Sequence, residues 1–126
     1  MNVLVVDDSP GIGLVLTRYF ARLGHSCTHA PDGMAALEKL RTSPLPDVIF
    51  VDLLMPGLSG QELVCELQHH PDLGRVPVVL MSGFEAAEED LPPSGSYQAI
   101  LVKPFELQEL DAVLEAATSW DVSSRD

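Results

Sequence analysis

The sequence has little positive charge and no long apolar run. Seven Lys and Arg residues stand against nineteen Asp and Glu residues, which gives a formal net charge of -12. Nucleic acids and anionic membrane surfaces are bound through basic faces, so this balance argues against both as direct partners. No apolar run approaches the roughly 20 residues of a membrane span, and no basic region precedes the first run at Val3. We therefore expect a soluble, cytoplasmic protein.

Cysteine is also scarce. Cys27 and Cys65 lie in apolar surroundings, without the Cys-x-x-Cys spacing of a redox or metal motif. Free thiols in a reducing compartment are the favoured interpretation, and a disulfide between the two is the alternative. A chain of 126 residues requires neither a disulfide nor a structural metal, because a domain of about 100–150 residues buries a sufficient core. We expect one domain over residues 1–118 and a polar, frayed tail over residues 119–126.

Two hydrophobic periods alternate along the chain. Continuous apolar runs, typical of strands buried on both faces of a parallel sheet, occur at Val3–Val6, Val48–Val51, Val76–Met81 and Ala99–Val102, with a weaker run at Ser26–His29. Segments with helical spacing separate the runs. Their starts are marked by N-cap residues, which are Ser9 before Pro10, Asp32, and Ser59 with Glu62. The alternation predicts an α/β fold, with a doubly wound sheet of five parallel strands, five helices and right-handed crossovers.

The segment between the fourth and fifth runs is irregular. Residues Phe84–Leu91 have the composition of a short, very acidic helix, but Pro92 and Pro93 follow at once. A proline inside a helix costs about 3 kcal/mol, because it removes a backbone donor and clashes with the preceding turn. We therefore predict a fourth helix that ends by Leu91.

Polar and charged residues follow the apolar runs. Ligands of a parallel α/β sheet bind outside the carboxyl ends of its strands, so these positions share one edge. They are Asp7, Asp8, Asp52, Ser82, Gly83, Lys103 and Pro104. Any one of them would fit a solvated loop or a helix cap. Together they predict a site with three carboxylates, a hydroxyl and an ammonium group.

The expected chemistry of this site is phosphoryl transfer. Three carboxylates held together repel one another unless a cation lies among them. Mg²⁺ prefers oxygen ligands, takes one or two carboxylates and bridges to a phosphate. Lys103 and Ser82 then offer a positive charge and a hydrogen-bond donor to phosphate oxygens. An Asp carboxylate can attack phosphorus to give an aspartyl phosphate, so the pattern predicts a Mg²⁺-assisted phospho-accepting site.

These stretches resemble the receiver domain of two-component response regulators. The resemblance covers nearly the whole chain and rests on the stretches 3–8, 52–60, 79–83 and 103–105. It implies a flavodoxin-like fold with strand order 2-1-3-4-5 and phosphorylation at Asp52. The other implied site residues are Asp7, Asp8 and the Leu54 backbone carbonyl as Mg²⁺ ligands, Ser82 beside Gly83 as the switch hydroxyl, Lys103 as the phosphoryl-binding cation, and Pro104 after a cis peptide bond.

Three residues near the site and the broken fourth helix depart from the family's pattern. Ile100 stands three residues before Lys103, where an aromatic switch residue is usual. We therefore predict that phosphorylation moves the loop 82–84 with little change at Ile100. Leu54 and Phe84 are bulky apolar residues where the family pattern flanks the path of the hydrolytic water, which predicts a slowly hydrolysing aspartyl phosphate. A shortened fourth helix indicates either an unusual partner or local mobility.

The resemblance also implies the partners. The phosphoryl group would come from a histidine kinase or a histidine phosphotransfer protein, with Mg²⁺ as cofactor, and output would occur through contact with an unidentified protein. Such a domain is not an enzyme, since it catalyses only its own phosphorylation and dephosphorylation. A stand-alone regulator and a receiver excised from a longer hybrid kinase or regulator fit equally. The main alternative function is that of a degenerate, non-phosphorylated receiver acting as a protein-interaction module.

Other classes fit the residues less well. Gly11 and Gly13 follow the first run, but Leu16 occupies the third glycine position of a dinucleotide-binding motif. A haloacid-dehalogenase-like phosphatase usually has a second aspartate where Leu54 stands. A flavodoxin-like electron carrier needs a Ser/Thr/Gly-rich phosphate loop that the first run does not lead into. We expect His25 and His29, which flank the weak second run, to be edge residues rather than phosphohistidines.

Overall fold

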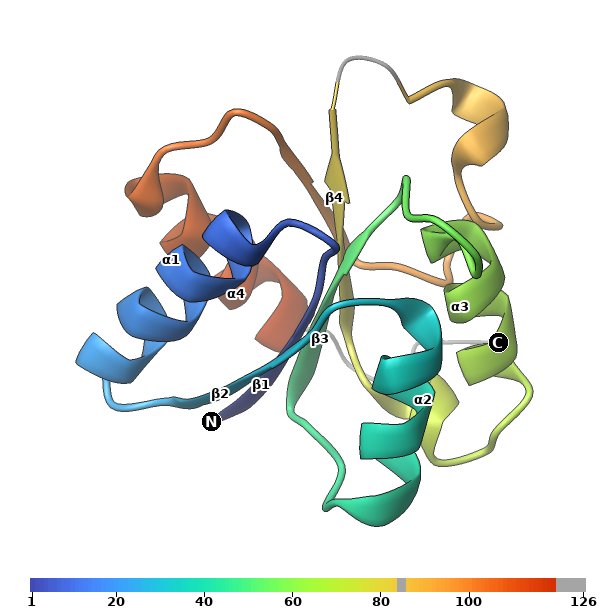
Figure 1. The fold of residues 1–126 in the computed structure, drawn as a ribbon, viewed down its shortest axis with the longest axis horizontal. Helices are drawn as coiled ribbons and strands as arrows, with labels where there is room; N and C mark the ends of the chain where they lie inside the picture. Colours follow the sequence, from blue (N-terminus) through green and yellow to red (C-terminus); the bar gives the residue numbers. More distant parts are fainter. Residues whose placement is uncertain (84–85, 120–126) are drawn as a thin grey trace.

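The apolar runs form the strands of a parallel sheet. The structure, a computed structural model, describes residues 1–83 and 86–119. Its strands are β1 (Asn2–Val6), β2 (Ser26–Ala30), β3 (Val48–Asp52), β4 (Val78–Ser82) and β5 (Ala99–Val102), in the order β2-β1-β3-β4-β5 (Figure 1). All neighbouring pairs are parallel. The predicted doubly wound, flavodoxin-like fold and its strand order are confirmed.

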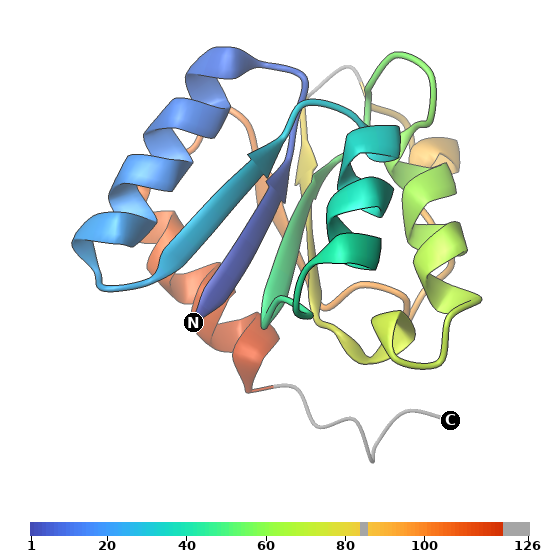
Figure 2. The ribbon, with the colours of Figure 1, turned by 60° about the horizontal axis from the view of Figure 1, so that its bottom comes forward.

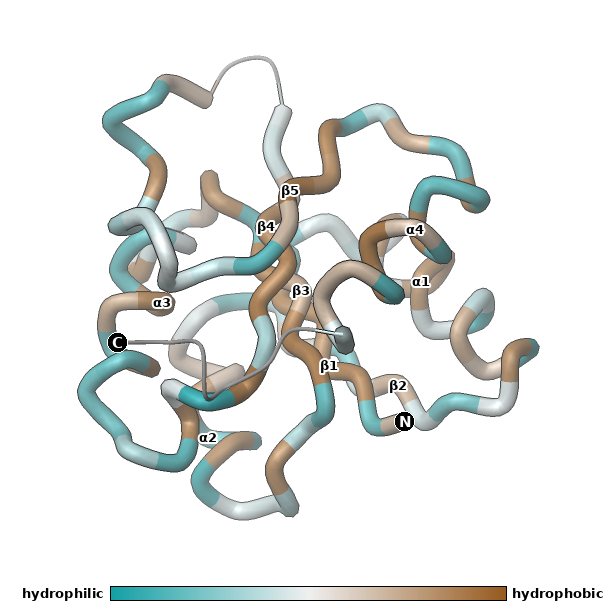
Figure 3. The backbone as a smooth tube through the Cα atoms, turned by 180° about the vertical axis from the view of Figure 1, so that it is seen from behind, coloured by the Kyte–Doolittle hydropathy of each residue, from teal (hydrophilic) through white to brown (hydrophobic). Residues whose placement is uncertain are grey.

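Helices cover both faces of this sheet. The part of the chain that the structure describes contains four α-helices, which are α1 (Pro10–Arg22), α2 (Gly33–Thr42), α3 (Gly60–Gln68) and α4 (Leu107–Thr118). α1 and α4 pack on one face, and α2 and α3 pack on the other (Figure 2). Phe20 of α1 meets Phe50 of β3 on the first face, with ring centroids 5.4 Å apart. Hydrophobic residues therefore concentrate along the central strands, as Figure 3 shows.

Side-chain caps begin three helices where the sequence predicts them. The Ser9 hydroxyl accepts a hydrogen bond of 3.3 Å from the amide of Ile12, and Asp32 caps α2 in the same way over 2.8 Å. Ser59 and Glu62 form a reciprocal capping box at the start of α3. These caps satisfy amides that have no partner within the first helical turn. The Ser9 cap lies in the short loop from β1 to α1, beside the edge of the sheet where the predicted site lies.

The prediction of a fourth helix between β4 and β5 is wrong. Among the described residues of this connection, the only helical element is a 3₁₀ turn, Glu88–Asp90. The Asp90 carboxylate accepts a hydrogen bond from the amide of Ala87 (2.7 Å), which caps the start of this turn. Pro92 and Pro93 then provide no amide donors to continue a helix. The start of the predicted helix, Phe84 and Glu85, lies outside the described residues.

Side-chain hydrogen bonds hold this irregular connection against α3. We call residues 86–98 the β4–β5 segment. The Gln61 side-chain amide donates to the backbone carbonyls of Glu89 (2.9 Å) and Leu91 (2.8 Å). Because no helix covers β5 in the described part of this connection, Ile100 and Val102 are 40% and 57% exposed.

Three further expectations concern membrane-spanning helices, the cysteines and the C-terminal tail. None of the helices in the described part of the chain is long and apolar enough to cross a membrane. Cys27 and Cys65 are free thiols, as predicted, and both are half-buried. The expected frayed tail falls largely on residues 120–126, which are outside the described residues.

Candidate functional site

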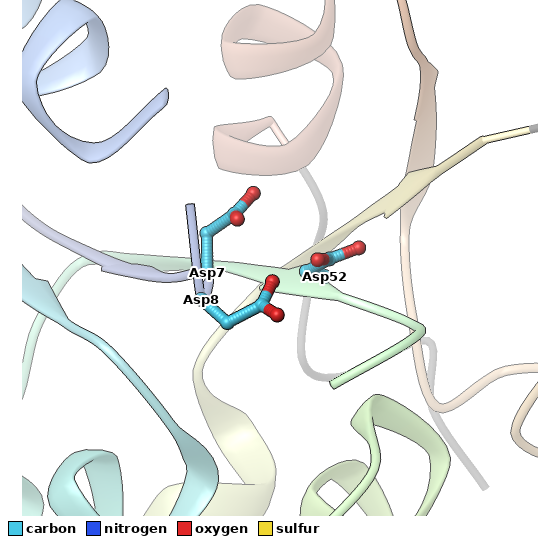
Figure 4. A group of neighbouring side chains, drawn as sticks. All are labelled: Asp7, Asp8 and Asp52. Carbon is cyan, nitrogen blue, oxygen red and sulfur yellow. The ribbon is translucent and has the colours of Figure 1, made fainter. Parts of the chain in front are cut away.

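Three aspartates meet at the carboxyl ends of β1 and β3. Val6 of β1 pairs with Val51 of β3, so Asp7 and Asp52 are the next residues on two adjacent parallel strands. One carboxylate oxygen each of Asp7, Asp8 and Asp52 lies within 4.8 Å of the other two (Figure 4). The sheet register thus produces the convergence that the sequence predicts.

The three carboxylates differ in their exposure and partners. Asp7 is fully buried, and its two oxygens accept hydrogen bonds from the Ser9 amide and the Lys103 ammonium group, both over 2.8 Å. Asp52 is 6% exposed, whereas Asp8 lies at the surface. A buried carboxylate must be hydrogen-bonded or paired. Asp7 meets this requirement within the protein, which leaves Asp8 and Asp52 with free oxygen lone pairs for an external cation.

Lys103 joins the two buried carboxylates. It follows β5, and its Nζ lies 2.8 Å from Asp7 Oδ2 and 3.4 Å from Asp52 Oδ2. Burial lowers the pKa of Lys103, but the hydrogen bond to Asp7 and the charge of Asp52 outweigh this effect and raise the pKa above its ordinary value. Lys103 therefore remains an ammonium group at neutral pH.

Asp52 is the carboxylate with the perturbed acidity. Burial raises the pKa of Asp52, the negative charge of Asp7 raises it further, and Lys103 only partly opposes them, so that the pKa reaches about 6. The Asp8 charge adds a smaller increase. A divalent cation among the three carboxylates would remove this repulsion and keep Asp52 ionised. The oxygen-only donor set suits a hard cation such as Mg²⁺.

Ser82 and Gly83 lie at the same edge of the sheet. Ser82 is the last residue of β4, one position beyond the Met81 that pairs with Asp52. Its hydroxyl donates to the Gly83 carbonyl (3.2 Å), and its own carbonyl accepts from the Lys103 amide (2.8 Å). The hydroxyl is therefore near the cluster but bonded to its own loop.

The remaining predicted residues surround this cluster less closely. The peptide bond between Lys103 and Pro104 is cis, as the resemblance implies. Leu54 follows Asp52 by two residues and is 38% exposed. Ile100 lies on β5, paired with Leu80, away from the carboxylates. Phe84 is outside the described residues.

One neighbour of the site was not predicted as a functional residue. His29 of β2 places Nε2 2.7 Å from the backbone carbonyl oxygen of Asp7. Sequence patterns gave no signal for this contact, because it depends on how closely β2 approaches α1. His29 lies within β2 rather than flanking it, and β2 is an edge strand of the sheet.

Comparison with known proteins identifies the family. A sequence profile of the response regulator receiver domain matches residues 3–115. The chain is 40% identical over 123 residues to the DNA-binding transcriptional regulator NtrC of Escherichia coli K12, covering 93% of this chain but only 24% of NtrC. It is 32% identical to protein Rrf1 of Nitratidesulfovibrio vulgaris, covering 92% of this chain and 81% of Rrf1.

Solved structures agree with the sequence relatives. The response regulator TrrA of Thermotoga maritima, determined in complex with Mg²⁺-BeF, superimposes with a TM-score of 0.78 at 28% identity, over 90% of this chain and 96% of TrrA. The fold, the acidic cluster and the sequence relatives all indicate the same family. The chain belongs to the family of response regulator receiver domains.

Proposed function

We propose that this chain accepts a phosphoryl group on Asp52 from a phosphohistidine of a histidine kinase or a histidine phosphotransfer protein. The observation that carries the proposal is the cluster of Asp7, Asp8 and Asp52 with Lys103 at one edge of the sheet. Its relatives include transcriptional regulators and a protein named as a sensor histidine kinase, TmoS.

In the proposed reaction, a carboxylate oxygen of Asp52 attacks phosphorus. The new O–P bond forms as the N–P bond of the phosphohistidine breaks, and the bonding electron pair returns to the imidazole nitrogen, which then takes up a proton. Little other covalent chemistry is required of the protein, so in-line positioning and charge neutralisation dominate. Asp52 is only 6% exposed, so few water molecules would compete with its carboxylate for the phosphorus atom.

The metal-binding residues in this proposal are Asp8, Asp52, the backbone carbonyl of Leu54 and, through its charge, Asp7. Mg²⁺ bound there would neutralise the carboxylates and the transferring phosphoryl oxygens. The donor set supports this role, because Asp8 and Asp52 keep free oxygen lone pairs whereas Asp7 is engaged by Ser9 and Lys103.

Lys103 and Ser82 are the proposed phosphoryl-binding side chains. Lys103 already lies 3.4 Å from Asp52 Oδ2, within reach of an oxygen on a group attached there. Ser82 would exchange its hydrogen bond to the Gly83 carbonyl for one to another phosphoryl oxygen. The hydrogen bond from the Lys103 amide to the Ser82 carbonyl keeps the two residues side by side at the ends of β4 and β5.

We place the protein in the cytoplasm, with output through contact with a protein partner. Phosphohistidine donors are made from ATP, and the two free cysteines suit a reducing compartment. The chain spans 24% of the length of NtrC, so the output of any longer protein is a separate question. Leu54 and Phe84 are proposed to slow hydrolysis of the aspartyl phosphate.

The test is the intact mass after incubation with acetyl phosphate, with and without Mg²⁺. The native protein should gain one phosphoryl group only with Mg²⁺, and Asp52→Asn should gain none. Asp72→Asn, at an exposed aspartate in the connection that leads into the amino end of β4, is the matched control and should behave as the native protein does. Phosphorylation of Asp52→Asn to the native extent would refute the assignment of Asp52.

A degenerate receiver that serves only as an interaction module is the second candidate. The observation that favours it is Ile100, which stands at the aromatic switch position and is 40% exposed. Such a protein would gain no mass from acetyl phosphate and would not respond to millimolar Mg²⁺. Mg²⁺ binding without mass gain would instead indicate a receiver that selects its phosphodonor.

A further inference from the structure

His29 holds the peptide that joins the first two aspartates of the site. Its Nε2 lies 2.7 Å from the backbone carbonyl oxygen of Asp7. A carbonyl oxygen only accepts hydrogen bonds, so Nε2 carries the proton and donates. The same carbonyl belongs to the peptide group whose nitrogen is that of Asp8.

A glycine on α1 creates the space for this imidazole. His29 pairs with Val5, whose side chain packs on the α1 and α4 face, so the His29 ring lies beneath α1. A Cβ atom at Gly13 would be 2.4 Å from two atoms of that ring, which no real side chain tolerates. The two residues therefore fit only as a pair, and any larger residue at position 13 displaces the ring.

The Asp7 side chain does not depend on His29, but Asp8 does. Asp7 is fixed by the Ser9 amide, by Lys103 and by its own amide, which donates to the Ala30 carbonyl (3.1 Å). The Asp8 carboxylate accepts no hydrogen bond from any residue that the structure describes. No side-chain contact with a described residue therefore fixes this carboxylate, and the backbone at Asp8 sets where the side chain starts and which rotamers it can adopt.

We infer that His29 is a positioning residue, which fixes the Asp7–Asp8 peptide and so directs the Asp8 carboxylate toward Asp52. The inference rests on the proposed function, because Asp8 matters there as a Mg²⁺ ligand. Residues that hydrogen-bond to a metal ligand, without contacting the metal themselves, typically contribute about 10–100-fold to metal affinity. A role in packing alone would require only a ring of the same size at position 29.

The test is titration with Mg²⁺ alone, followed by amide chemical shifts, in single and double variants. His29→Phe keeps a ring above Gly13 but removes the donor, and it should weaken Mg²⁺ binding about tenfold. Gly13→Ala should weaken binding similarly by displacing the ring. In a His29→Ala background, Gly13→Ala should leave the Kd unchanged, because there is no ring to displace.

Gly11→Ala is the matched control on the same helix. A Cβ there would meet only the Ser9 hydroxyl oxygen, at 3.8 Å, an ordinary contact, so Mg²⁺ binding should equal that of the native protein. Urea unfolding of each variant separates a loss of stability from a loss of affinity. The ¹⁵N shift of the Asp8 amide in the metal-free protein gives a second readout, which should change in His29→Phe and Gly13→Ala but not in Gly11→Ala.

Two results would overturn the inference while the proposed function stands. One is a native Kd in both His29→Phe and Gly13→Ala. The other is a Gly13→Ala effect that is equally large without His29, since a shift of α1 would then be the cause. A native protein that does not bind Mg²⁺ at millimolar concentration overturns the proposed function, and the role of His29 falls with it.

Discussion

At the scale of single residues, Asp52 combines two opposing requirements. The proposed reaction requires an ionised Asp52, yet burial and the charge of Asp7 raise its pKa to about 6, against 3.8 for an ordinary Asp. The folded state therefore holds a proton on Asp52 over a pH range in which the unfolded chain has lost it. Stability from this residue is fully present below about pH 4 and is lost as the pH rises through about 6.

We expect Asp52→Asn to become more stable than the native protein as the pH rises. In the metal-free proteins, the difference in the free energy of unfolding should grow by about 2 kcal/mol between pH 4 and pH 7, allowing for solvent screening. Urea unfolding in the presence of a chelator measures this difference. A gap that does not change with pH would show that Asp52 titrates normally.

Leu54 tests the proposed slow hydrolysis at the same scale. It is 38% exposed, two residues beyond Asp52, and its side chain offers no hydrogen bond to an attacking water. Leu54→Asn should shorten the lifetime of the aspartyl phosphate about tenfold, equal to about 1.4 kcal/mol of barrier. The decay of the phosphorylated mass after removal of acetyl phosphate measures it. Leu45→Asn, at an exposed leucine before the amino end of β3, is the control, and an equal effect there would contradict the prediction.

At the scale of elements, the β4–β5 segment depends on contacts rather than on helical structure. Gln61 supplies two of these, to the carbonyls of Glu89 and Leu91. Each net hydrogen bond of this kind contributes about 1 kcal/mol. The amides of Asp90 and Leu91, which bond within the 3₁₀ turn, report on whether the segment stays in place.

Gln61→Ala, which removes both bonds, should therefore increase hydrogen exchange at Asp90 and Leu91 about thirtyfold, while the amides of β4 keep their native rates. Gln108→Ala, at an exposed position on α4, should change neither. If the amides of the native β4–β5 segment exchanged hydrogen as slowly as those of β4, the result would contradict the alternative that this segment is locally mobile. No change in Gln61→Ala would mean that other contacts hold the segment.

The elements also show what a sequence can and cannot predict here. The strands were predictable because both faces of the sheet are buried, so that Val48–Asp52 is apolar until its final residue. The site was predictable because Asp7 and Asp52 directly follow paired positions on parallel strands. The acidic segment before Pro92 was misjudged because its composition permits a helix, whereas the described part of the segment forms only the 3₁₀ turn Glu88–Asp90. The His29 contact depends on space left by Gly13, and no periodic pattern carries that information.

At the scale of the whole molecule, the acidic site is a source of instability that a cation can relieve. A ligand that binds only the folded state stabilises it by RT ln(1 + [L]/Kd), which is about 2.7 kcal/mol at one hundred times the Kd. Mg²⁺ should therefore raise the Tm of the native protein, and a chelator should reverse the increase. Asp8→Asn should lose most of this response, whereas Asp72→Asn should retain it. An equal Mg²⁺ response in Asp8→Asn would place the ion elsewhere.

The ion pair between Lys103 and Asp7 spans 96 positions of the sequence. Asp7, Asp8 and Asp52 leave the ribosome well before Lys103 does, so a growing chain carries the three carboxylates without their counter-charge. Burial of Asp7 and Asp52 at the ends of β1 and β3 costs little free energy only once β5 has been synthesised and has joined the sheet. On the proposed function, the ability to accept a phosphoryl group would therefore arise late in biosynthesis, because a chain interrupted before β5 lacks Lys103 and the last strand of the sheet.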